Sequence, residues 1–215
     1  MKNKTTSAVT REKGNTAAMP VTKAAKPTPA YKVLFSPKAG ISKELSRMTQ
    51  AAAQEISVAA YAFSSKYLGN ALIAAMKRGV KIRLILDKDN AEKSYFLDEW
   101  LIENGIDVRF LKVKSGCMHH KFLIIDRIRL MTGSYNFTND SEFRNHEAAI
   151  FINATTTTGV TTSIISTNAI VKAFTAEFER LWSLASAPSP RAANSRRCRL
   201  QSAHRRIPRL FGGKG

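Results

Sequence analysis

The sequence predicts an α/β fold with substantial parallel strand pairing, flanked by two polar tails. Between residues 31 and 111, short apolar stretches of strand length alternate with stretches whose apolar residues recur at helical spacing. From residue 119 onward, two apolar stretches follow one another too closely for a helix to lie between them. Of the 215 residues, 44% are hydrophobic, which is enough for a sizeable core.

The first half of the predicted domain alternates strands and helices. We expect strands at residues 31–35, 56–63, 81–86 and 106–111, and helices at residues 41–54, 66–78 and 91–104. Gly79 and Gly105 follow two of these helices and are typical helix stops. Such an alternation is typical of layered folds with parallel strands.

The second half predicts a different arrangement. Residues 119–125 and 128–134 form two predicted strands in close succession, and residues 148–152 form a third. Residues 154–168 consist mostly of Thr, Ser and Gly, so we expect a loop there, with room for a β-hairpin. A final helix is expected over residues 169–184, with bulky apolar residues on one side.

Positive charge is concentrated in the two tails. Residues 1–30 hold six Lys/Arg and one Glu, and residues 186–215 hold eight Lys/Arg and no acid, within a formal net charge of +18. We expect a disordered basic arm at 1–30, one folded domain at 31–185 and a disordered Arg-rich tail at 186–215. The basic surplus favours polyanionic partners, nucleic acid before an anionic membrane surface.

Cysteine usage and hydropathy bear on the compartment. The two cysteines, Cys117 and Cys198, make no disulfide framework, which favours a reducing compartment. No apolar run is long enough to span a membrane, and no apolar core follows the N-terminal lysines as it would in a secretory signal. We therefore expect a cytoplasmic protein without stable membrane insertion, with export as the alternative.

The most concentrated group of reactive side chains lies in the two strands predicted at 119–134. In order, they are His119, Lys121, Asp126, Ser134 and Asn136. Side chains alternate along a strand, so His119 and Lys121 project from the same face. Asp126 has the opposite parity, which predicts a structural role at the turn.

A hairpin with a two-residue turn at 127–128 would bring these side chains together. Two cross-strand pairs are expected, His119 with Asn136 and Lys121 with Ser134, with Cβ atoms roughly 5 Å apart. A three-residue loop would break this match. Gly133 lacks a side chain and lets another backbone or a ligand come close.

Such a face suits the cleavage of a phosphodiester without a metal or a cofactor. His119 can attack phosphorus as a neutral imidazole and form a phosphohistidine. Lys121, Ser134 and Asn136 can donate to the non-bridging oxygens. Glu147, an acid at the mouth of the next apolar strand, is expected to hold a histidine in its reactive tautomer.

One motif per chain leaves the departing oxygen without a proton donor. A two-fold homodimer would place His119 of both subunits in one site. One histidine would then be the nucleophile and the other the general acid.

The segment HHKFLIID at 119–126, followed by GSYN at 133–136, resembles the HKD motif of the phospholipase D superfamily. With its single copy, the region 31–185 is similar to the small Nuc-type endonucleases. The resemblance implies a catalytic domain built on a mixed β-sheet with helices on both faces. It also implies a homodimer that shares one site, and metal-independent chemistry through phosphohistidine.

The resemblance also implies a role for each motif residue. His119, Lys121 and Asn136 match catalytic and phosphate-binding positions, and Ser134 and Asp126 match the motif serine and aspartate. Glu147 matches a histidine-orienting acid, and with His119, Lys121 and Asp126 it makes up the expected catalytic set.

The same residues allow other interpretations. Cys117, His119 and His120 could suggest zinc, but the sequence offers no second ligand pair at the usual spacing. Tyr61 is expected in the core. As functions, a nuclease for DNA, RNA or both competes with a phospholipase D-type lipid hydrolase and with a non-catalytic nucleic-acid binding module.

Overall fold

The computed structural model describes residues 31–91, 97–154 and 161–188, and the side chains of these residues except 161–167. The predicted arm at 1–30 and the predicted tail beyond residue 188 lie outside the described residues. Ser186 and Phe110 form a backbone bridge, so the contacts of the domain extend past the boundary expected at residue 185.

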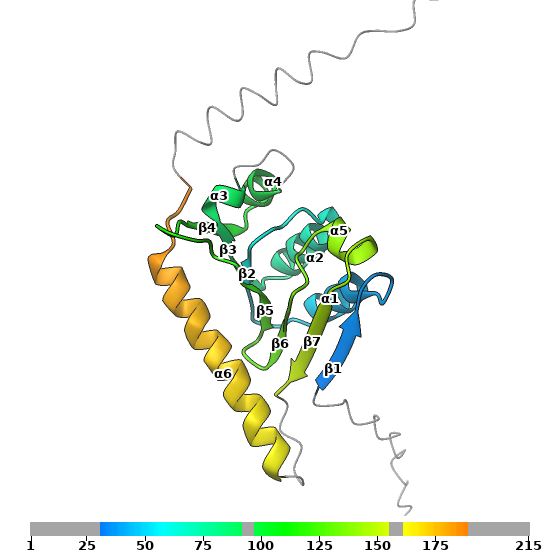
Figure 1. Cartoon of the computed structure of the whole chain (residues 1–215). Coiled ribbons are helices and arrows are strands. Elements are labelled where there is room, and N and C mark those ends of the chain that lie inside the picture. Colours follow the sequence, from blue (N-terminus) through cyan, green and yellow to red (C-terminus); the bar gives the residue numbers. More distant parts are fainter. Residues whose placement is uncertain (1–30, 92–96, 155–160, 189–215) are drawn as a thin grey trace, which may run out of the picture.

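The chain forms seven strands and six helices over these ranges (Figure 1). The strands are β1 (Tyr31–Phe35), β2 (Glu55–Ala60), β3 (Lys81–Asp87), β4 (Asp107–Leu111), β5 (Lys121–Ile125), β6 (Arg129–Gly133) and β7 (Ala148–Asn153). The helices are α1 (Ile41–Gln50), α2 (Lys66–Lys77), α3 (Lys88–Ala91), α4 (Asp98–Glu103), α5 (Asn139–Phe143) and α6 (Thr161–Leu184).

All seven strands belong to one mixed sheet with the order β1-β7-β6-β5-β2-β3-β4. Strands β2, β3 and β4 pair in parallel, whereas β1, β7, β6 and β5 pair antiparallel. The two halves meet where β2 lies antiparallel to β5, with Ala60 opposite Lys121. The carboxyl end of a parallel strand therefore lies beside the amino end of β5, and ligands commonly bind outside the carboxyl ends of such strands.

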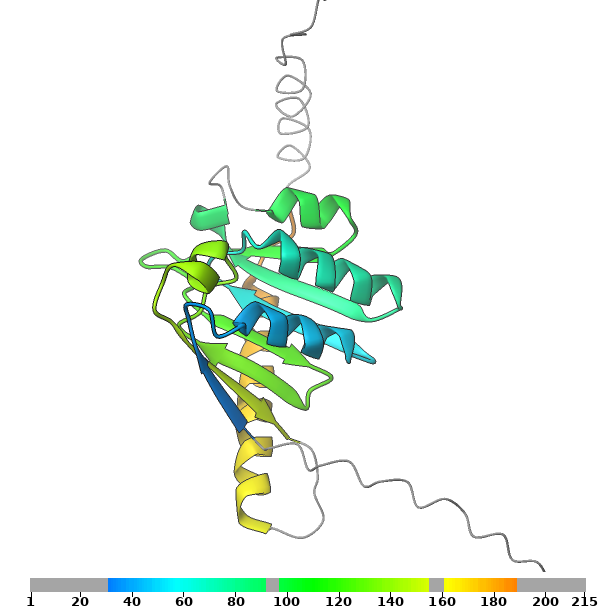
Figure 2. The same ribbon diagram turned by 90° about the vertical axis from the view of Figure 1, so that its right-hand side faces the viewer.

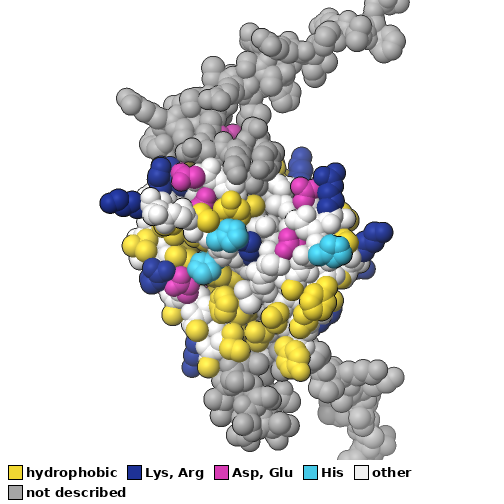
Figure 3. Space-filling model, viewed as in Figure 1, with side chains coloured by type: hydrophobic (Ala, Val, Ile, Leu, Met, Phe, Trp, Pro, Cys, Tyr) yellow, Lys and Arg dark blue, Asp and Glu magenta, His cyan; other side chains and the backbone are white. Residues whose placement is uncertain are grey.

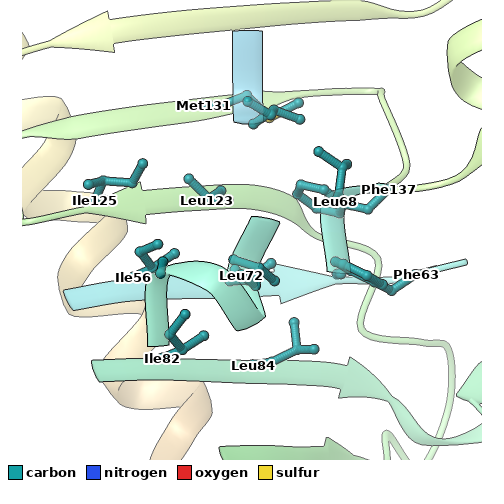
Figure 4. Packing of buried hydrophobic residues seen from close by; sticks show 14 of the residues in the cluster. Ile56, Phe63, Leu68, Leu72, Ile82, Leu84, Leu123, Ile125, Met131 and Phe137 are labelled. Atoms are coloured by element: carbon teal, nitrogen blue, oxygen red, sulfur yellow. The ribbon is translucent and has the colours of Figure 1, made fainter. Parts of the chain in front are cut away.

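Helices cover both faces of the sheet, as the resemblance implied. Helices α1 and α2 lie on one face and the long α6 crosses the other (Figure 1 and Figure 2). Because strand residues alternate, Ile56 and Val58 belong to the core under α1 and α2, whereas Ala59 belongs to the core under α6. Figure 4 shows the first of these cores, in which Leu72 of α2 packs over the central strands.

Arg83 of β3 attaches α6 to the sheet. Its guanidinium makes hydrogen bonds of 2.8 and 2.6 Å to the carboxylate of Glu179 and lies 4.9 Å from the ring centre of Phe178. The hydrogen bonds from Arg83 also hold the pKa of Glu179 below its usual value. A mostly buried charge is tolerable here because it is both paired and stacked.

Two of the predicted elements were wrong in extent. The helix expected over 91–104 is not one helix: α3 ends at Ala91 and α4 begins at Asp98, where acidic residues suit the first turn. The loop expected over 154–168 is helical from Thr161, the first residue of α6. Thr and Ser are weak helix formers, but extending an existing helix carries no nucleation cost.

Within the described ranges, none of the helices has the length and apolar character needed to traverse a bilayer. The predicted compartment stays a prediction.

Candidate active site

His119 and Lys121 lie where β5 begins, beside the carboxyl end of β2. Lys121 is 7% exposed, and its Nζ donates to the backbone oxygen of His119 at 2.8 Å. The ring of Tyr61, the residue after β2, has its centre 4.4 Å from that of the His119 ring and 5.0 Å from Lys121 Nζ. Tyr61 is only partly buried and contacts both motif residues, so its assignment to the core was wrong.

The surroundings of His119 favour its neutral form. Partial burial lowers the pKa of His119 below its usual value, and the positive charges of Lys121 and His120 lower it further. The carboxylate of Asp87 acts in the opposite direction. A neutral imidazole is the form that can attack phosphorus.

Phosphodiester cleavage is expected to slow as the pH falls through the pKa of His119, because protonation of the imidazole removes its nucleophilic lone pair. Since that pKa lies below the ordinary value of 6.5, the loss is expected at a lower pH than an unperturbed histidine would give. A profile of kcat/KM against pH measures this. An acid limb centred above 6.5 would contradict the neutral-imidazole account.

The hairpin that carries the motif has a different register from the predicted one. Ile125 pairs with Arg129, which leaves a three-residue turn between β5 and β6. Every predicted pair is displaced by one residue. Two predicted pairs are therefore wrong: His119 with Asn136, and Lys121 with Ser134.

The side chain of Asp126 accounts for the longer turn. Its carboxylate accepts hydrogen bonds from three successive backbone N–H groups, those of Ala53, Gln54 and Glu55, at 3.0, 2.7 and 3.0 Å. Burial raises the pKa of Asp126, but these bonds outweigh it, and the net shift is downward. Asp126 lies at the far end of β5 from His119 and takes a left-handed backbone conformation with φ 51°, which Asp tolerates.

Asp126→Ala is expected to lower the free energy of unfolding by roughly 1–3 kcal/mol, because three amides lose a charged acceptor. Folded Asp126→Ala enzyme is expected to keep most of its kcat. Urea denaturation and steady-state kinetics measure the two effects, with exposed Asp140→Ala as the control. Unchanged stability with lost kcat would instead give Asp126 a direct part in the chemistry.

The Gly-Ser-Tyr-Asn segment leaves the sheet at the end of β6. Gly133 has φ 153°, and a Cβ there would overlap the carbonyl oxygen of Ala148, which confirms that glycine permits a close backbone approach. Ser134 N donates to Ala148 O at 3.0 Å, and Ser134 Oγ accepts from Ala148 N at 3.1 Å. The hydroxyl proton of Ser134 is not used by these bonds and can donate to a ligand.

Asn136 lies beside the segment that follows β2. The next residue, Phe137, donates from its backbone N to Ala62 O at 3.2 Å, one residue from Tyr61. Asn136 Oδ1 is buried and has no hydrogen-bond partner among the described residues. Buried polar groups are nearly always bonded, so this acceptor would need a donor from a ligand, whereas the Nδ2 of the same amide is the atom that can donate to a phosphate oxygen.

Two residues that the sequence did not single out hold this loop in place. Tyr135 is fully buried and donates to the carboxylate of Glu142 at 2.8 Å, which also accepts from Ser42 N at 2.9 Å. Burial raises the pKa of Tyr135, so the hydroxyl stays protonated and donates. Glu142 lies on the short helix α5, whose sequence signal is the N-cap Thr138 accepting from Ser141 N.

Glu147 directly precedes β7, as predicted. Its carboxylate accepts from Asn145 Nδ2 at 3.1 Å. Burial lowers the pKa of Lys121, and the charges of Cys117 and Glu147 oppose that shift. In the part of the chain that the structure describes, no hydrogen bond joins Glu147 to His119, so its role as an orienting acid stays a prediction.

His120 points away from His119, toward α6. Its Nε2 lies 3.3 Å from Glu177 Oε1. Cys117 is exposed, and over the described ranges no three His, Cys, Asp or Glu side chains converge in a way that could hold a metal. His120, one of the suggested zinc ligands, therefore contacts Glu177 of α6 instead.

The fold and the motif define a class of protein. Residues 45–182 match the family described as cardiolipin synthase, PLD-like domain. This match covers more than half of the chain and includes the junction of β2 with β5. The chain belongs to this family of phospholipase D-like domains.

Individual relatives agree with the family. Phospholipase D from Rickettsia felis is 39% identical over 118 residues, which cover 55% of this chain and 58% of that protein. Mitochondrial cardiolipin hydrolase from Mus musculus is 34% identical over 138 residues, which cover 64% of this chain and 56% of that protein. The chain therefore spans less than two thirds of the length of either relative.

A solved structure confirms the predicted fold class. Nuc from Salmonella typhimurium, a phospholipase D family member, aligns with a TM-score of 0.64 at 23% identity. The alignment covers 75% of this chain and 99% of that one. The shared feature is the mixed sheet between two helical layers.

Proposed function

We propose that the chain is a metal-independent phosphodiesterase, and specifically an endonuclease with little sequence preference that cleaves DNA, RNA or both. One observation carries the proposal. An exposed His119 with a lowered pKa lies beside a nearly buried Lys121 at the junction of the two halves of the sheet. Lys121 Nζ bonds to the backbone oxygen of His119, so a nucleophile and a fixed cation lie close together, as attack on a phosphodiester requires.

The reaction has two displacement steps at phosphorus. In the first, a ring nitrogen of His119 bonds to phosphorus as the bond to the leaving oxygen breaks. Lys121, Ser134 and Asn136 donate to the non-bridging oxygens, whose charge grows in the five-coordinate state. A protonated histidine gives its proton to the leaving oxygen. This second histidine is then neutral and takes a proton from water. The oxygen of that water attacks phosphorus, displaces His119 and releases the phosphate monoester.

The second histidine in this scheme is His119 of the partner subunit. Each chain carries one motif, so one subunit supplies half of a site. A two-fold axis through the site would give each His119 the same position relative to the phosphate. We therefore include a homodimer in the proposed function.

An exposed apolar surface on β1 and β7 supports this homodimer. Val33 and Ile150 are cross-strand partners and are 41% and 39% exposed, and Phe35 is 66% exposed. Figure 3 shows hydrophobic side chains gathered over β1 and β7 on the same face as histidine side chains. Phe35 precedes Ser36, whose Oγ accepts from Glu147 N at 3.1 Å, so the surface adjoins the site.

Charge favours nucleic acid as the substrate. The chain has a formal net charge of +18, and contacts between basic side chains and backbone phosphates supply affinity without sequence preference. A phospholipid is the second candidate, because the relatives above are named phospholipase D and cardiolipin hydrolase and the same chemistry would serve a lipid phosphodiester.

Cleavage of four nucleic acids and two lipids in excess EDTA tests the proposal. The nucleic acids are single- and double-stranded DNA and RNA, and the lipids are cardiolipin and phosphatidylcholine vesicles. We expect cleavage of at least one nucleic acid and slower or no turnover of the lipids. Turnover of cardiolipin alone would favour the lipid hydrolase, and binding of nucleic acid without any cleavage would favour a binding module.

A further inference from the structure

A buried carboxylate outside the motif faces the segment that carries His119. Asp87, the last residue of β3, is 3% exposed. Its Oδ2 accepts from the backbone N of Met118 at 2.9 Å, and its Oδ1 accepts from the backbone N of Asn90, also at 2.9 Å. A carboxylate buried at a strand end needs such partners, because burying an uncompensated charge is costly.

The two oxygens of Asp87 have different tasks. The bond to Asn90 N spans three residues and has the geometry of a cap on α3. The bond to Met118 N joins positions 31 residues apart in the sequence and contributes nothing to a helix. It fixes the residue immediately before His119.

Asn90 provides a second connection to the same segment. Its Nδ2 donates to the backbone oxygen of Tyr61 at 2.7 Å, and Tyr61 N donates to His120 O at 2.9 Å. The ring of Tyr61 lies against the ring of His119. His119 is therefore held on both sides, through Met118 before it and His120 after it.

We propose that Asp87 is a positioning residue that fixes the backbone on either side of His119. It acts directly through Met118, and it acts together with Asn90 through Tyr61. It does not touch the substrate. The catalytic consequence rests on the proposed function, because it concerns the aim of His119 at phosphorus. A misplacement of about 1 Å in such a group is enough to cost roughly 100-fold in rate.

The charge of Asp87 gives the proposal a second, independent consequence. The charged groups that act on His119 are Lys121 and His120, which lower its pKa, and Asp87, which raises it. Further out, Glu147 and Cys117 act on Lys121, and Glu177 of α6 contacts His120. Removing the charge of Asp87 leaves the lowering influences unopposed, so the pKa of His119 moves further down.

Asp87→Asn tests the proposal because it keeps the shape and removes the charge and one acceptor. Asp89→Asn is the matched control, since Asp89 lies two residues away with 58% of its side chain exposed, paired with Lys112. The pKa of His119 is measured by NMR titration of histidine-labelled protein, with its signal assigned from His119→Gln. Steady-state kinetics on a single-stranded oligonucleotide give kcat and KM.

We expect the His119 titration midpoint of Asp87→Asn to move to lower pH and kcat to fall roughly 10- to 100-fold, with KM nearly unchanged. Asp89→Asn should match the wild type in all three quantities. An unmoved midpoint together with an unchanged kcat would overturn the proposal. A loss confined to KM would also overturn it, because it would make Asp87 a substrate-binding group.

If Asp87→Asn does not fold, Asn90→Ala provides a second test of the same proposal. It removes the side-chain bond to Tyr61 and leaves the charge of Asp87 in place. We expect kcat to fall by roughly 10-fold while the acid limb of the pH profile keeps its position. If folded Asn90→Ala had the wild-type kcat, the proposed connection from Asn90 through Tyr61 would be excluded. If the wild type cleaved no nucleic acid, the proposed function would fail, whereas the NMR titration would still decide whether Asp87 acts on His119.

Discussion

His119→Ala is expected to reduce phosphodiester cleavage by roughly 1,000-fold or more, to background. The substitution removes the nucleophile from one half of the site and the proton donor from the other half. Single-turnover cleavage of a labelled oligonucleotide in excess EDTA measures the loss. Circular dichroism of the variant should be unchanged, since the exposed His119 side chain contributes little to the core.

His120→Ala is the matched control for this prediction. The two histidines are neighbours in sequence, but His120 contacts Glu177 of α6 and lies away from the site. We expect His120→Ala to keep its rate within a fewfold of the wild type. Equal losses in both variants would mean that the segment tolerates no change, and full activity of His119→Ala would exclude His119 as the nucleophile.

Phe35→Glu is expected to convert a dimer to a monomer and to remove most of the activity. The ring of Phe35 is 66% exposed in a single chain, and placing a carboxylate in a dimer contact would bury two like charges close to the two-fold axis. Sedimentation velocity and cleavage assays on the same preparation measure both effects. The predicted result is a parallel loss of dimer and rate.

Tyr67→Glu is the control for the dimer prediction. Tyr67 is 53% exposed on α2, which covers the opposite face of the sheet from the surface that holds Phe35. Its substitution should leave both the dimer and the rate unchanged. A fully active monomer, in the wild type or in Phe35→Glu, would contradict a site shared between subunits.

The sequence was most informative where structure is local or periodic. The strands around Ala59 and Ile85 follow from apolar runs of strand length, and α2 follows from its helical spacing and the stop at Gly79. The parity of Asp126 also indicated a structural role, and its three bonds to backbone amides are what such a role requires. Local chemistry and strand period act over a few residues, so a single sequence displays them.

The features that the sequence did not reveal depend on contacts between distant segments. The register of the β5–β6 hairpin is set by Asp126 reaching the amides of residues 53–55, which the turn sequence alone does not show. The bond between Asp87 and Met118 also joins distant segments and could not be predicted from either one alone. The sequence pattern places Tyr61 in an apolar strand, but Tyr61 lies past the end of β2. Residues at strand ends meet partners that only the fold brings together.

In the proposed reaction, His119 becomes bonded to phosphorus during turnover. The most direct measurement is alkaline quenching of the enzyme with an oligonucleotide substrate in excess EDTA, followed by peptide mapping by mass spectrometry. We expect a phosphorylated or nucleotidylated His119 during turnover and no such adduct in His119→Ala. Rapid cleavage without any adduct on His119, or an adduct on another residue, would contradict it.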